Sequence, residues 1–354
     1  MPRTDPRPVL DRSGLVIVDK PAGMTSHDVV GRMRRIFRTR RIGHSGTLDP
    51  AATGVLVVGV ERGTRFLAHV VTHDKRYAAT VRFGASTLTD DAEGEVLSTA
   101  DPSQLAALTA DRIRAAFAEQ TGEIMQRPSS VSSVKVDGRR AHELVREGVE
   151  VVLPERPVTV FSLEVDEVRL LPRSASGGRG TDGGEDATHA GLSGLSGEAV
   201  VEADIRVHCS SGTYIRAIAR DVGESLGVGG HLTALRRLSV GPFDVTEART
   251  LPLLEGSGDP AGTGSAETAA AERSGSSPVP ALSLTLDEAM VRCFPVRAVS
   301  EEEGDALALG KWLDPVGEDG VVAAVTPSGR AVALLEESGG RARSVFVARP
   351  AGMR

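Results

Sequence analysis

Cysteine is nearly absent from this sequence of 354 residues, and no long apolar run occurs in it. The two cysteines, Cys209 and Cys293, lie far apart, which excludes a disulfide framework and the close ligand spacing of a zinc site. The low cysteine content favours a location in the reducing cytoplasm. The opening segment MPRTDPRPVLDRSG has no apolar signal core, and the most apolar run, VLVVGV at 55–60, is too short to span a bilayer. We therefore expect a cytoplasmic protein without a membrane partner.

Aromatic residues make up only 3% of the chain. Trp312 is the only tryptophan, and Tyr77 and Tyr214 are the only tyrosines. The ordinary role of such residues is packing in a core. Because so few are present, each tyrosine is also a candidate for a specific contact in a site.

Charge is distributed unevenly along the chain. The formal net charge is −7, but 16 acids and 10 bases lie from residue 246 onward, so the first 245 residues are nearly neutral. Six arginines with no acid between them occupy one short segment: Arg32, Arg34, Arg35, Arg38, Arg40 and Arg41. A general preference for arginine over lysine explains their type but not their density. We expect an anion-binding face here, by analogy with basic surfaces that bind phosphates.

Two Gly/Ser/Ala-rich segments, 172–198 and 255–281, contain few large apolar residues. Neither can bury enough surface to offset its ordering entropy, so both are predicted to be flexible. The first interrupts a domain as a surface insert, and the second reads as a disordered linker. The predicted organisation is a flexible tail at 1–12, a catalytic domain at 13–254 and a small β-rich domain at 282–354.

The local patterns predict strands with helices interspersed. Residues 201–208 alternate apolar and polar, as do 75–84, which is typical of half-buried strands. Thr25 and Asp28 resemble a capping box that opens a helix, and 110–122 and 212–227 read as further helices that end at glycines. We expect an α+β fold with a mixed, mostly antiparallel central sheet and flanking helices.

The segment GHSGTLDPAATG at 43–54 places a single acid, Asp49, in a basic and glycine-rich loop. Pro50 restricts Asp49 to extended geometry, and the glycines permit tight turns and the close approach of another backbone. Asp49 could be a nucleophile, a base, a metal ligand or a turn former. No second carboxylate is nearby for a metal, and the ending of a P-loop is absent. An ionised carboxylate beside a basic face suggests covalent chemistry on a polyanion.

Four segments in order resemble one known family: GLVIVDKPAGMTSHDVV, RIGHSGTLDPAATGVLVV, DKRYAATVRFGASTLTDDAEGEV and HCSSGTYIRAIARDVGESLG. They are similar to the hallmark segments of the bacterial tRNA pseudouridine synthases B. The resemblance covers roughly 13–250 apart from the Gly-rich insert. The segment 282–354 more weakly resembles the PUA-like C-terminal domain of the actinobacterial branch.

The resemblance implies catalytic roles for three residues. Asp49 corresponds to the family's nucleophile, and Arg216 to the arginine that forms an ion pair with it. Tyr77 corresponds to the tyrosine that lies against the target base. The implied substrate-binding residues are Lys20, Pro21, His44, Tyr214 and Leu238. Read from the helix pattern alone, Arg216 is an ordinary surface arginine.

The segment 122–152 resembles the family insertion that clamps the T-loop of tRNA. Phosphate contacts are expected from basic residues here and in the arginine-rich segment, namely Arg40, Arg41, Lys135, Arg139 and Arg140. His142 departs from the tyrosine that the family often has, which puts in doubt a stacking role at that position.

The implied reaction isomerises the T-loop uridine (uridine-55) of tRNA to pseudouridine after the base is flipped out of its stack. Because no atoms are gained, neither a cofactor nor a metal is expected. Asp49 could attack the ribose C1′ or the uracil C6, or assist glycal formation. The expected partner is the T-stem and T-loop of tRNA, and we expect a monomer with no protein partner.

Two alternatives remain. The chain could be a tRNA-folding chaperone whose catalysis is secondary, or an RNA-guided pseudouridine synthase of the archaeal and eukaryotic type. The complete set of catalytic residues argues against lost catalysis, and the clamp-like segment favours direct recognition of tRNA.

Overall fold

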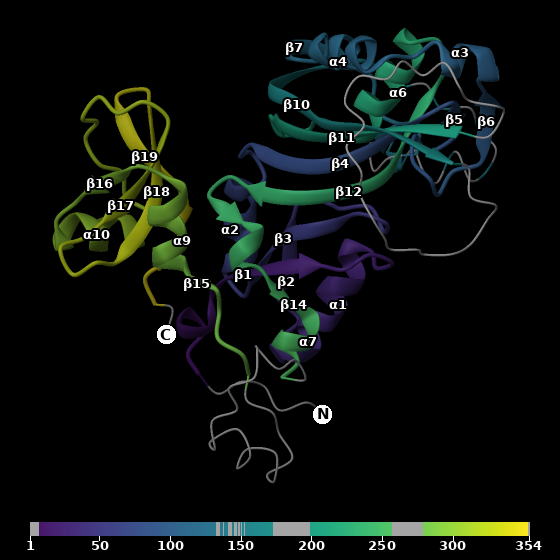
Figure 1. Ribbon diagram of the computed structural model, residues 1–354. Helices are drawn as coiled ribbons and strands as arrows, with labels where there is room; N and C mark the ends of the chain where they lie inside the picture. The colour runs from purple at the N-terminus through teal and green to yellow at the C-terminus, as the bar shows by residue number, and fades with distance from the viewer. Residues whose placement is uncertain are drawn as a thin grey trace. The chain divides into compact units, whose positions relative to one another are not determined.

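The computed structural model describes residues 7–131, 153–172, 199–256 and 279–352, with scattered positions between 135 and 151 (Figure 1). The chain forms two compact units: Met1–His73 with Arg237–Arg354, and Asp74–Arg236. The flexibility predicted for 172–198 and 255–281 falls almost entirely on residues outside the described part. In the described residues no helix is long and apolar enough to cross a membrane.

The largest sheet has the strand order β14-β1-β3-β12-β4-β11-β10-β7. The strand β12 (Gly230–Val240) begins in the second unit and ends in the first. Among its pairs with a defined register, β1 with β14 is parallel, whereas pairs such as β1 with β3 and β4 with β11 are antiparallel. A mixed, mostly antiparallel sheet with helices confirms the predicted α+β class.

The N-terminal part of the first unit places its strands between helices. Its elements are η1 (Leu10–Arg12), β1 (Gly14–Lys20), α1 (Ser26–Ile36), β2 (Ile42–Ser45), β3 (Thr53–Val60) and α2 (Gly63–Val70). Alternate residues of a strand point to opposite faces. In β1, Ile17 therefore packs with Phe66 of α2, while Val18 packs with Met33 of α1. Burial on both faces explains why β1 and β3 read as continuous apolar runs.

The helix α1 begins as the sequence predicts. The Thr25 side chain accepts a hydrogen bond from the Asp28 backbone N–H, and the Asp28 carboxylate accepts one from the Thr25 backbone N–H. This capping box fixes the first turn. The apolar stripe faces the core, while Arg34 and Arg35 are exposed.

The same unit is completed by residues from 237 onward. Short elements follow β12: β13 (Phe243–Asp244), η2 (Val245–Glu247), β14 (Arg249–Thr250) and α7 (Leu251–Leu254). The C-terminal elements are β15 (Leu284–Thr285), α9 (Leu286–Cys293), β16 (Val296–Ala298), α10 (Glu301–Ala308), β17 (Val321–Val325), β18 (Ala331–Ser338) and β19 (Arg341–Val347). The strands β16 to β19 form a separate four-stranded sheet, which confirms the predicted β-rich C-terminal segment.

This C-terminal segment shares a core with the strands near the N-terminus. Leu334 and Phe346 belong to the same apolar cluster as Ile17 and Phe66. The strand β15 also pairs with β1, opposite Gly14 and Leu15. Residues 282–354 therefore lie within the first unit, and the predicted domain boundary at 282 stays a prediction.

The described part of the second unit combines antiparallel strands with helices. Its elements are β4 (Lys75–Phe83), β5 (Ala85–Thr87), β6 (Val96–Thr99), α3 (Pro102–Ala106), α4 (Ala110–Ala118), β7 (Gly122–Gln126), β8 (Lys135–Val136), β9 (Arg139–Arg140), β10 (Arg156–Pro172), β11 (Ala199–Cys209) and α6 (Ile215–Ser225). The alternation predicted for 75–84 is confirmed, because Tyr77, Ala79, Val81 and Phe83 are all buried.

Two helix boundaries differ from the sequence patterns. The helix predicted for 110–122 ends at Ala118, and Gly122, with a φ of +99°, begins the strand β7 instead of closing the helix. The helix predicted for 212–227 begins at Ile215, because Gly212 has a φ of +89° and cannot lie in a right-handed helix.

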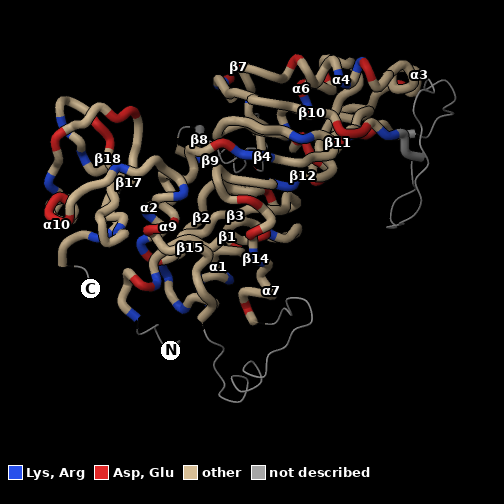
Figure 2. Tube along the Cα trace, turned by 60° about the vertical axis from the view of Figure 1, so that its left-hand side comes forward, with Lys and Arg blue, Asp and Glu red and all other residues tan. Residues whose placement is uncertain are grey.

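Charged residues cover the polar positions of β4, β10 and β11. Figure 2 shows blue and red segments interspersed along this part of the chain. The Asp204 carboxylate accepts hydrogen bonds from Thr80 and Arg169, and Arg82 donates two to Glu202. Alternating charges of opposite sign on neighbouring strands stabilise the pairing and leave this surface close to neutral.

Candidate active site

The loop between β2 and β3 holds Asp49 and is fixed on the side of Leu48. The Ser26 hydroxyl accepts a hydrogen bond from the Leu48 N–H at 2.9 Å and donates one to the Leu48 carbonyl at 3.1 Å. Ser26 is the first residue of α1 and is buried. Both peptide groups of Leu48, the residue before Asp49, are therefore hydrogen-bonded to the first residue of α1.

The other side of Asp49 is fixed by Lys20, which is 0% exposed. Its Nζ donates hydrogen bonds to the carbonyls of Pro21, Met24 and Pro50 at 3.0, 2.6 and 3.1 Å. The Gly23 N–H donates to the same Pro50 carbonyl at 2.9 Å. The structure thus places Lys20 and Pro21 beside the Asp49 loop. These contacts give the Lys20 ammonium a positioning role, and its direct contact with substrate stays a prediction.

Replacing Lys20 with Met should destabilise the fold. The change would remove the charged donor that serves the carbonyls of Pro21, Met24 and Pro50. The Pro50 carbonyl would still accept the hydrogen bond from the Gly23 N–H. Loss of a hydrogen bond to a charged group costs about 1.5–3 kcal/mol, and these carbonyls are only partly shielded from water, so we expect the free energy of unfolding to fall by about 2–4 kcal/mol. Urea unfolding measures this loss. The exposed Lys311→Met variant is the control, and equal stability of the two variants would contradict the internal role of Lys20.

Arg237 of β12 also holds this loop, and the sequence analysis did not find it. It is 1% exposed, and its Nε and Nη2 donate to the carbonyls of Val55 and Gly46 at 2.7 and 3.1 Å. A Cβ added to Gly54 would lie 2.2 Å from the Arg237 carbonyl oxygen, and Gly54 has a φ of +99°. The sequence analysis expected another backbone to come close to Gly54, and in the structure that backbone is β12 at Arg237. The sequence signal for a buried arginine was weak, because it consisted of the mixture of polar and apolar residues in β12.

His44 and Leu238 complete the set in the first unit. His44 lies on β2 and Leu238 follows Arg237 on β12, and both are partly buried. Burial, and then the charge of Arg237, lower the pKa of His44 below its ordinary value of 6.5. The imidazole is therefore neutral at pH 7 and can offer one donor and one acceptor to a base.

The titration of His44 can be measured by NMR. We expect a midpoint below 6.5, assigned by loss of its resonances in His44→Gln. Because the unfolded chain binds this proton more readily than the folded one, the contribution of His44 to stability is present above pH 6.5 and is lost as the pH falls below it. A midpoint above 6.5 would show that burial does not dominate its environment.

Arg216 is the second residue of α6 and is 7% exposed, so its interpretation as a surface arginine is wrong. Its Nη1 donates to the Thr89 carbonyl at 2.7 Å and its Nη2 to the Val131 carbonyl at 3.2 Å. Nη1 also lies 3.6 Å from the Asp91 carboxylate. Asp91 is a residue that sequence reasoning missed, although the adjacent acids of TLTDDAEG in a recognised segment could have indicated it.

The two tyrosines lie on neighbouring elements of the second unit. Tyr77 is buried on β4, against which α6 packs. Tyr214 is the residue before α6, and Gln126 of β7 holds both of its peptide groups. The Tyr214 N–H donates to Gln126 Oε1 at 2.7 Å, and Gln126 Nε2 donates to the Tyr214 carbonyl at 3.0 Å. The start of α6, and with it Arg216, is therefore anchored to β7.

Asp90, next to Asp91, has a raised pKa. Burial is the main cause, and it is opposed by the hydrogen bond from Ser129 and by the charge of Arg220. Asp90 also has a φ of +57°, which is uncommon for a residue other than glycine. The loop whose Thr89 carbonyl accepts a hydrogen bond from Arg216 thus has a strained backbone, one buried acid, Asp90, and one partly buried acid, Asp91.

The predicted site residues form two groups. Lys20, Pro21, His44, Asp49 and Leu238 belong to the first unit, and Tyr77, Tyr214 and Arg216 belong to the second. Within the first unit the structure places Lys20 and Pro21 beside the Asp49 loop, and within the second it places Tyr214 directly before Ile215 and Arg216 on α6, which packs against the strand of Tyr77. The ion pair between Asp49 and Arg216 joins residues of different units and stays a prediction.

The predicted phosphate contacts are only partly described. Arg40 and Arg41 are exposed, and Arg41 lies 3.7 Å from the carboxylate of buried Glu61. Arg139 is exposed and donates to Glu147. Lys135 and Arg140 lie in the short hairpin of β8 and β9, but their side chains and His142 fall outside the described residues.

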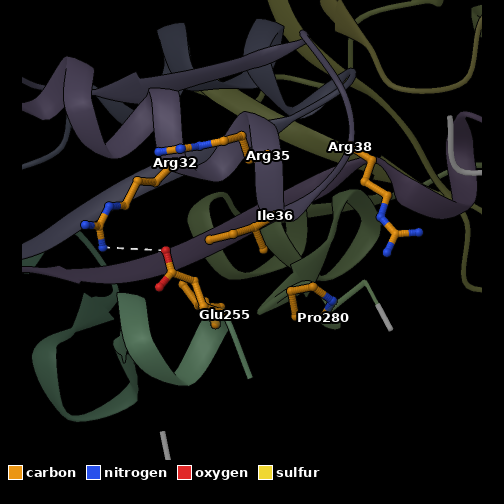
Figure 3. A pocket seen from close by; sticks show the side chains of 7 residues that line it. Arg32, Arg35, Ile36, Arg38, Glu255 and Pro280 are labelled. Carbon is orange, nitrogen blue, oxygen red and sulfur yellow. Dashed lines mark ion pairs between the residues drawn. The ribbon is translucent and has the colours of Figure 1, made fainter. Parts of the chain in front are cut away.

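A pocket of about 420 Å³ lies on the arginine-rich segment (Figure 3). It is lined by Arg32, Arg35, Ile36, Arg38, Leu254, Glu255 and Pro280. Figure 3 shows Arg32 directed toward Glu255, to which it lies at 3.5 Å, and Arg38 on the opposite side of the pocket. The segment is therefore less uniformly basic in space than in sequence, because the fold brings Glu61 and Glu255 to it. None of the predicted catalytic residues lines this pocket.

Comparison with known proteins identifies relatives along the whole chain. Residues 34–175 match the model of the TruB family pseudouridylate synthase N-terminal domain, and 294–349 match that of the tRNA pseudouridine synthase II C-terminal domain. Residues 216–257 match a tRNA pseudouridylate synthase B C-terminal domain. The tRNA pseudouridine synthase B of Corynebacterium jeikeium is 63% identical over 347 residues, which are 98% of each chain. That of Rhodococcus jostii is 47% identical over 99% of each chain.

Solved structures show a similar fold. The match to a crystal structure of a Cbf5-Nop10-Gar1 complex has a TM-score of 0.63 at 23% identity and covers 99% of this chain and 92% of the other. A structure of an H/ACA RNP bound to a substrate RNA matches with a TM-score of 0.62 at 21% identity, covering 99% and 93%. At these identities the likeness concerns the fold alone.

Proposed function

The chain belongs to the tRNA pseudouridine synthase B family, and from this premise we propose that Asp49 is the nucleophile with which it isomerises the T-loop uridine of tRNA. The enzyme is thus an isomerase that makes pseudouridine in tRNA. The observation that carries the assignment to Asp49 is the fixation of its loop on both sides, by Ser26 and by Lys20. A nucleophile held in one position loses little entropy on reaching the transition state.

The reaction breaks the N–C glycosidic bond, turns the uracil and rejoins it through C5. Uridine and pseudouridine are isomers, so the reaction consumes no second substrate. The target base has to leave its stack to be reached, which requires a pocket with an aromatic surface. We assign this surface to Tyr77, the tyrosine of β4, and the alignment of the nucleophile to Arg216.

The assay that tests this function follows tritium release from C5-labelled uridine in an unmodified tRNA transcript. We expect turnover by the protein alone, without a guide RNA, and none with a transcript that carries cytidine at the T-loop position. A requirement for a guide RNA would overturn direct recognition of tRNA. Turnover elsewhere in the cytidine transcript would overturn the proposed target nucleotide.

We further propose that a monomer docks on the T-stem and T-loop in the cytoplasm, with the exposed Arg40 and Arg41 contacting phosphates. Basic side chains that neutralise phosphates release counterions, so affinity falls steeply with salt. The double variant Arg40→Gln/Arg41→Gln should flatten the plot of log affinity against log salt by about 0.7–0.9 for each lost phosphate contact. Filter binding over a range of salt concentrations measures this slope.

The control for the salt experiment is Arg112→Gln/Arg114→Gln, which removes two exposed arginines of α4. This variant should keep the wild-type slope. An equal change in both variants would indicate a general charge effect and would contradict docking through Arg40 and Arg41.

A further inference from the structure

The side of α6 that carries Arg216 carries a second arginine, Arg220, four residues later. Side chains at this spacing lie one above the other on the same face of a helix. Arg216 is buried, and only 18% of the Arg220 side chain is exposed. Both guanidinium groups are therefore largely shielded from water, and a cation in this position has to satisfy its donors within the protein.

The two arginines hold the same two stretches of backbone, 89–91 and 127–131. Arg220 donates from Nη1 to the Asp90 carboxylate at 3.2 Å and from Nη2 to the Arg127 carbonyl at 2.8 Å. The guanidinium one turn earlier donates to one carbonyl in each stretch, as described above. Each of the two planar groups thus joins the loop after β5 to the segment after β7.

Ser129 links the two stretches directly, and it is 0% exposed. Its hydroxyl donates a hydrogen bond to the Asp90 carboxylate and lies 3.2 Å from the Thr89 carbonyl oxygen. The backbone of Asp90 is held as well, because its carbonyl accepts a hydrogen bond from the Leu232 N–H at 3.0 Å. The Asp90 carboxylate is therefore the point at which α6, the loop after β5 and the segment after β7 meet.

Asp90 lies between the two residues of its loop that Arg216 contacts. Thr89 provides the carbonyl that accepts from Nη1 at 2.7 Å, and the Asp91 carboxylate lies 3.6 Å from the same nitrogen. A shift of Asp90 therefore moves both groups of the loop that orient this guanidinium. Asp90 is itself 8% exposed, and a buried carboxylate requires a charged partner, which Arg220 provides.

The Arg220 guanidinium has a second acid partner, Asp221, which is its neighbour on α6 and accepts from Nε at 2.8 Å. Asp221 belongs to the helix, so this contact orients the arginine without reaching the loop. Asp90 is the partner through which the arginine holds the loop after β5.

We propose that Asp90 and Arg220 are positioning residues for the reaction, because their ion pair fixes the loop that orients the Arg216 guanidinium. The pair acts through Arg216, so the inference rests on the proposed function of that residue in aligning the nucleophile. A displacement of about 1 Å in an aligning group costs on the order of 10²-fold in rate. Breaking the pair should therefore slow turnover without weakening the affinity for tRNA.

The test compares single-turnover rates at saturating tRNA with dissociation constants from filter binding. Asp90→Asn keeps the shape of the side chain and an acceptor for Ser129, but it removes the charge that pairs with Arg220. We expect this variant to lower the rate by about tenfold or more and to leave the dissociation constant of tRNA unchanged. Arg220→Lys keeps the charge but loses the fork that also reaches Arg127, so it should lower the rate as well.

A combination with Arg216→Lys separates positioning from a general loss of stability. If Asp90 acts through Arg216, the double variant Arg216→Lys/Asp90→Asn should be no slower than Arg216→Lys alone, because the orientation is already lost. Losses that multiply would overturn the proposal. The control is Asp166→Asn, which breaks an exposed ion pair of 2.7 Å with Arg206 and should keep the wild-type rate.

Two other results would also overturn the inference. A wild-type rate in folded Asp90→Asn with a lower melting temperature would make the pair purely structural, and weaker binding at an unchanged rate would assign the loop to tRNA binding. Should Asp90→Asn fail to fold, Arg220→Lys provides the same comparison. An inactive wild-type protein would instead mark failure of the proposed function.

Discussion

Replacing Asp49 with Asn should abolish pseudouridine formation and leave tRNA binding intact. The amide has nearly the same size as the carboxylate, so the anchors from Ser26 and Lys20 to the neighbouring peptide groups remain. It lacks the negative charge that makes the carboxylate a nucleophile. Loss of a nucleophile lowers kcat on the order of 10⁴-fold or more. Tritium release under single-turnover conditions measures the rate, and filter binding measures the affinity.

The matched control for Asp49→Asn is Asp11→Asn, which changes an exposed carboxylate of the same unit. This variant should keep the wild-type kcat. Measurable turnover by Asp49→Asn would remove Asp49 from the role of nucleophile. The same variant also addresses the chaperone interpretation, because a protein whose main role is tRNA refolding would support refolding equally well with Asn at this position.

Replacing Arg216 with Lys should lower kcat by about a hundredfold while the protein remains folded. Lysine keeps the positive charge but lacks the planar fork that reaches the Thr89 and Val131 carbonyls together. The side chain would then no longer be held in one orientation beside Asp91. A displacement of about 1 Å in a group that aligns the reacting atoms costs on the order of 10²-fold in rate.

A purely structural role of Arg216 would have a different signature. If this arginine only stabilised the loop, Arg216→Lys would lower the melting temperature and leave the kcat of the folded fraction unchanged. The control is Arg112→Lys, since Arg112 is exposed and donates to a single carbonyl, that of Ala107. It should alter neither quantity. A wild-type kcat in Arg216→Lys would contradict the alignment role.

The buried strand faces could be read directly from the sequence because their pattern is local. Alternation in β4 places Tyr77 on the inner face with Phe83, and the structure confirms this placement. The beginning of α1 was predictable for the same reason, since Thr25 and Asp28 satisfy each other within one turn. Helix ends were predicted less well, because Gly122 starts a strand and does not close α4.

Contacts between residues distant in the chain were not predictable from any local pattern. Nothing near Arg237 in sequence indicates that its guanidinium reaches Gly46 and Val55, some 190 and 180 positions earlier. Such contacts depend on which strands are neighbours in the sheet. The acid Glu61, brought to the exposed Arg41, was missed for the same reason.

The sequence alone was sufficient to indicate the family, the α+β class and the candidate nucleophile Asp49. The order of the motifs and the local periodicity are properties of the sequence itself and can be read without a structure. Only the tertiary structure showed what holds that nucleophile in place. Lys20 and Arg237 are cations by sequence, and each could have been a surface group or a phosphate contact. Buried, a cation has to satisfy its donors within the protein. The nearest acceptors are the carbonyls of the Asp49 loop and its neighbours, and this requirement makes both residues supports of the site.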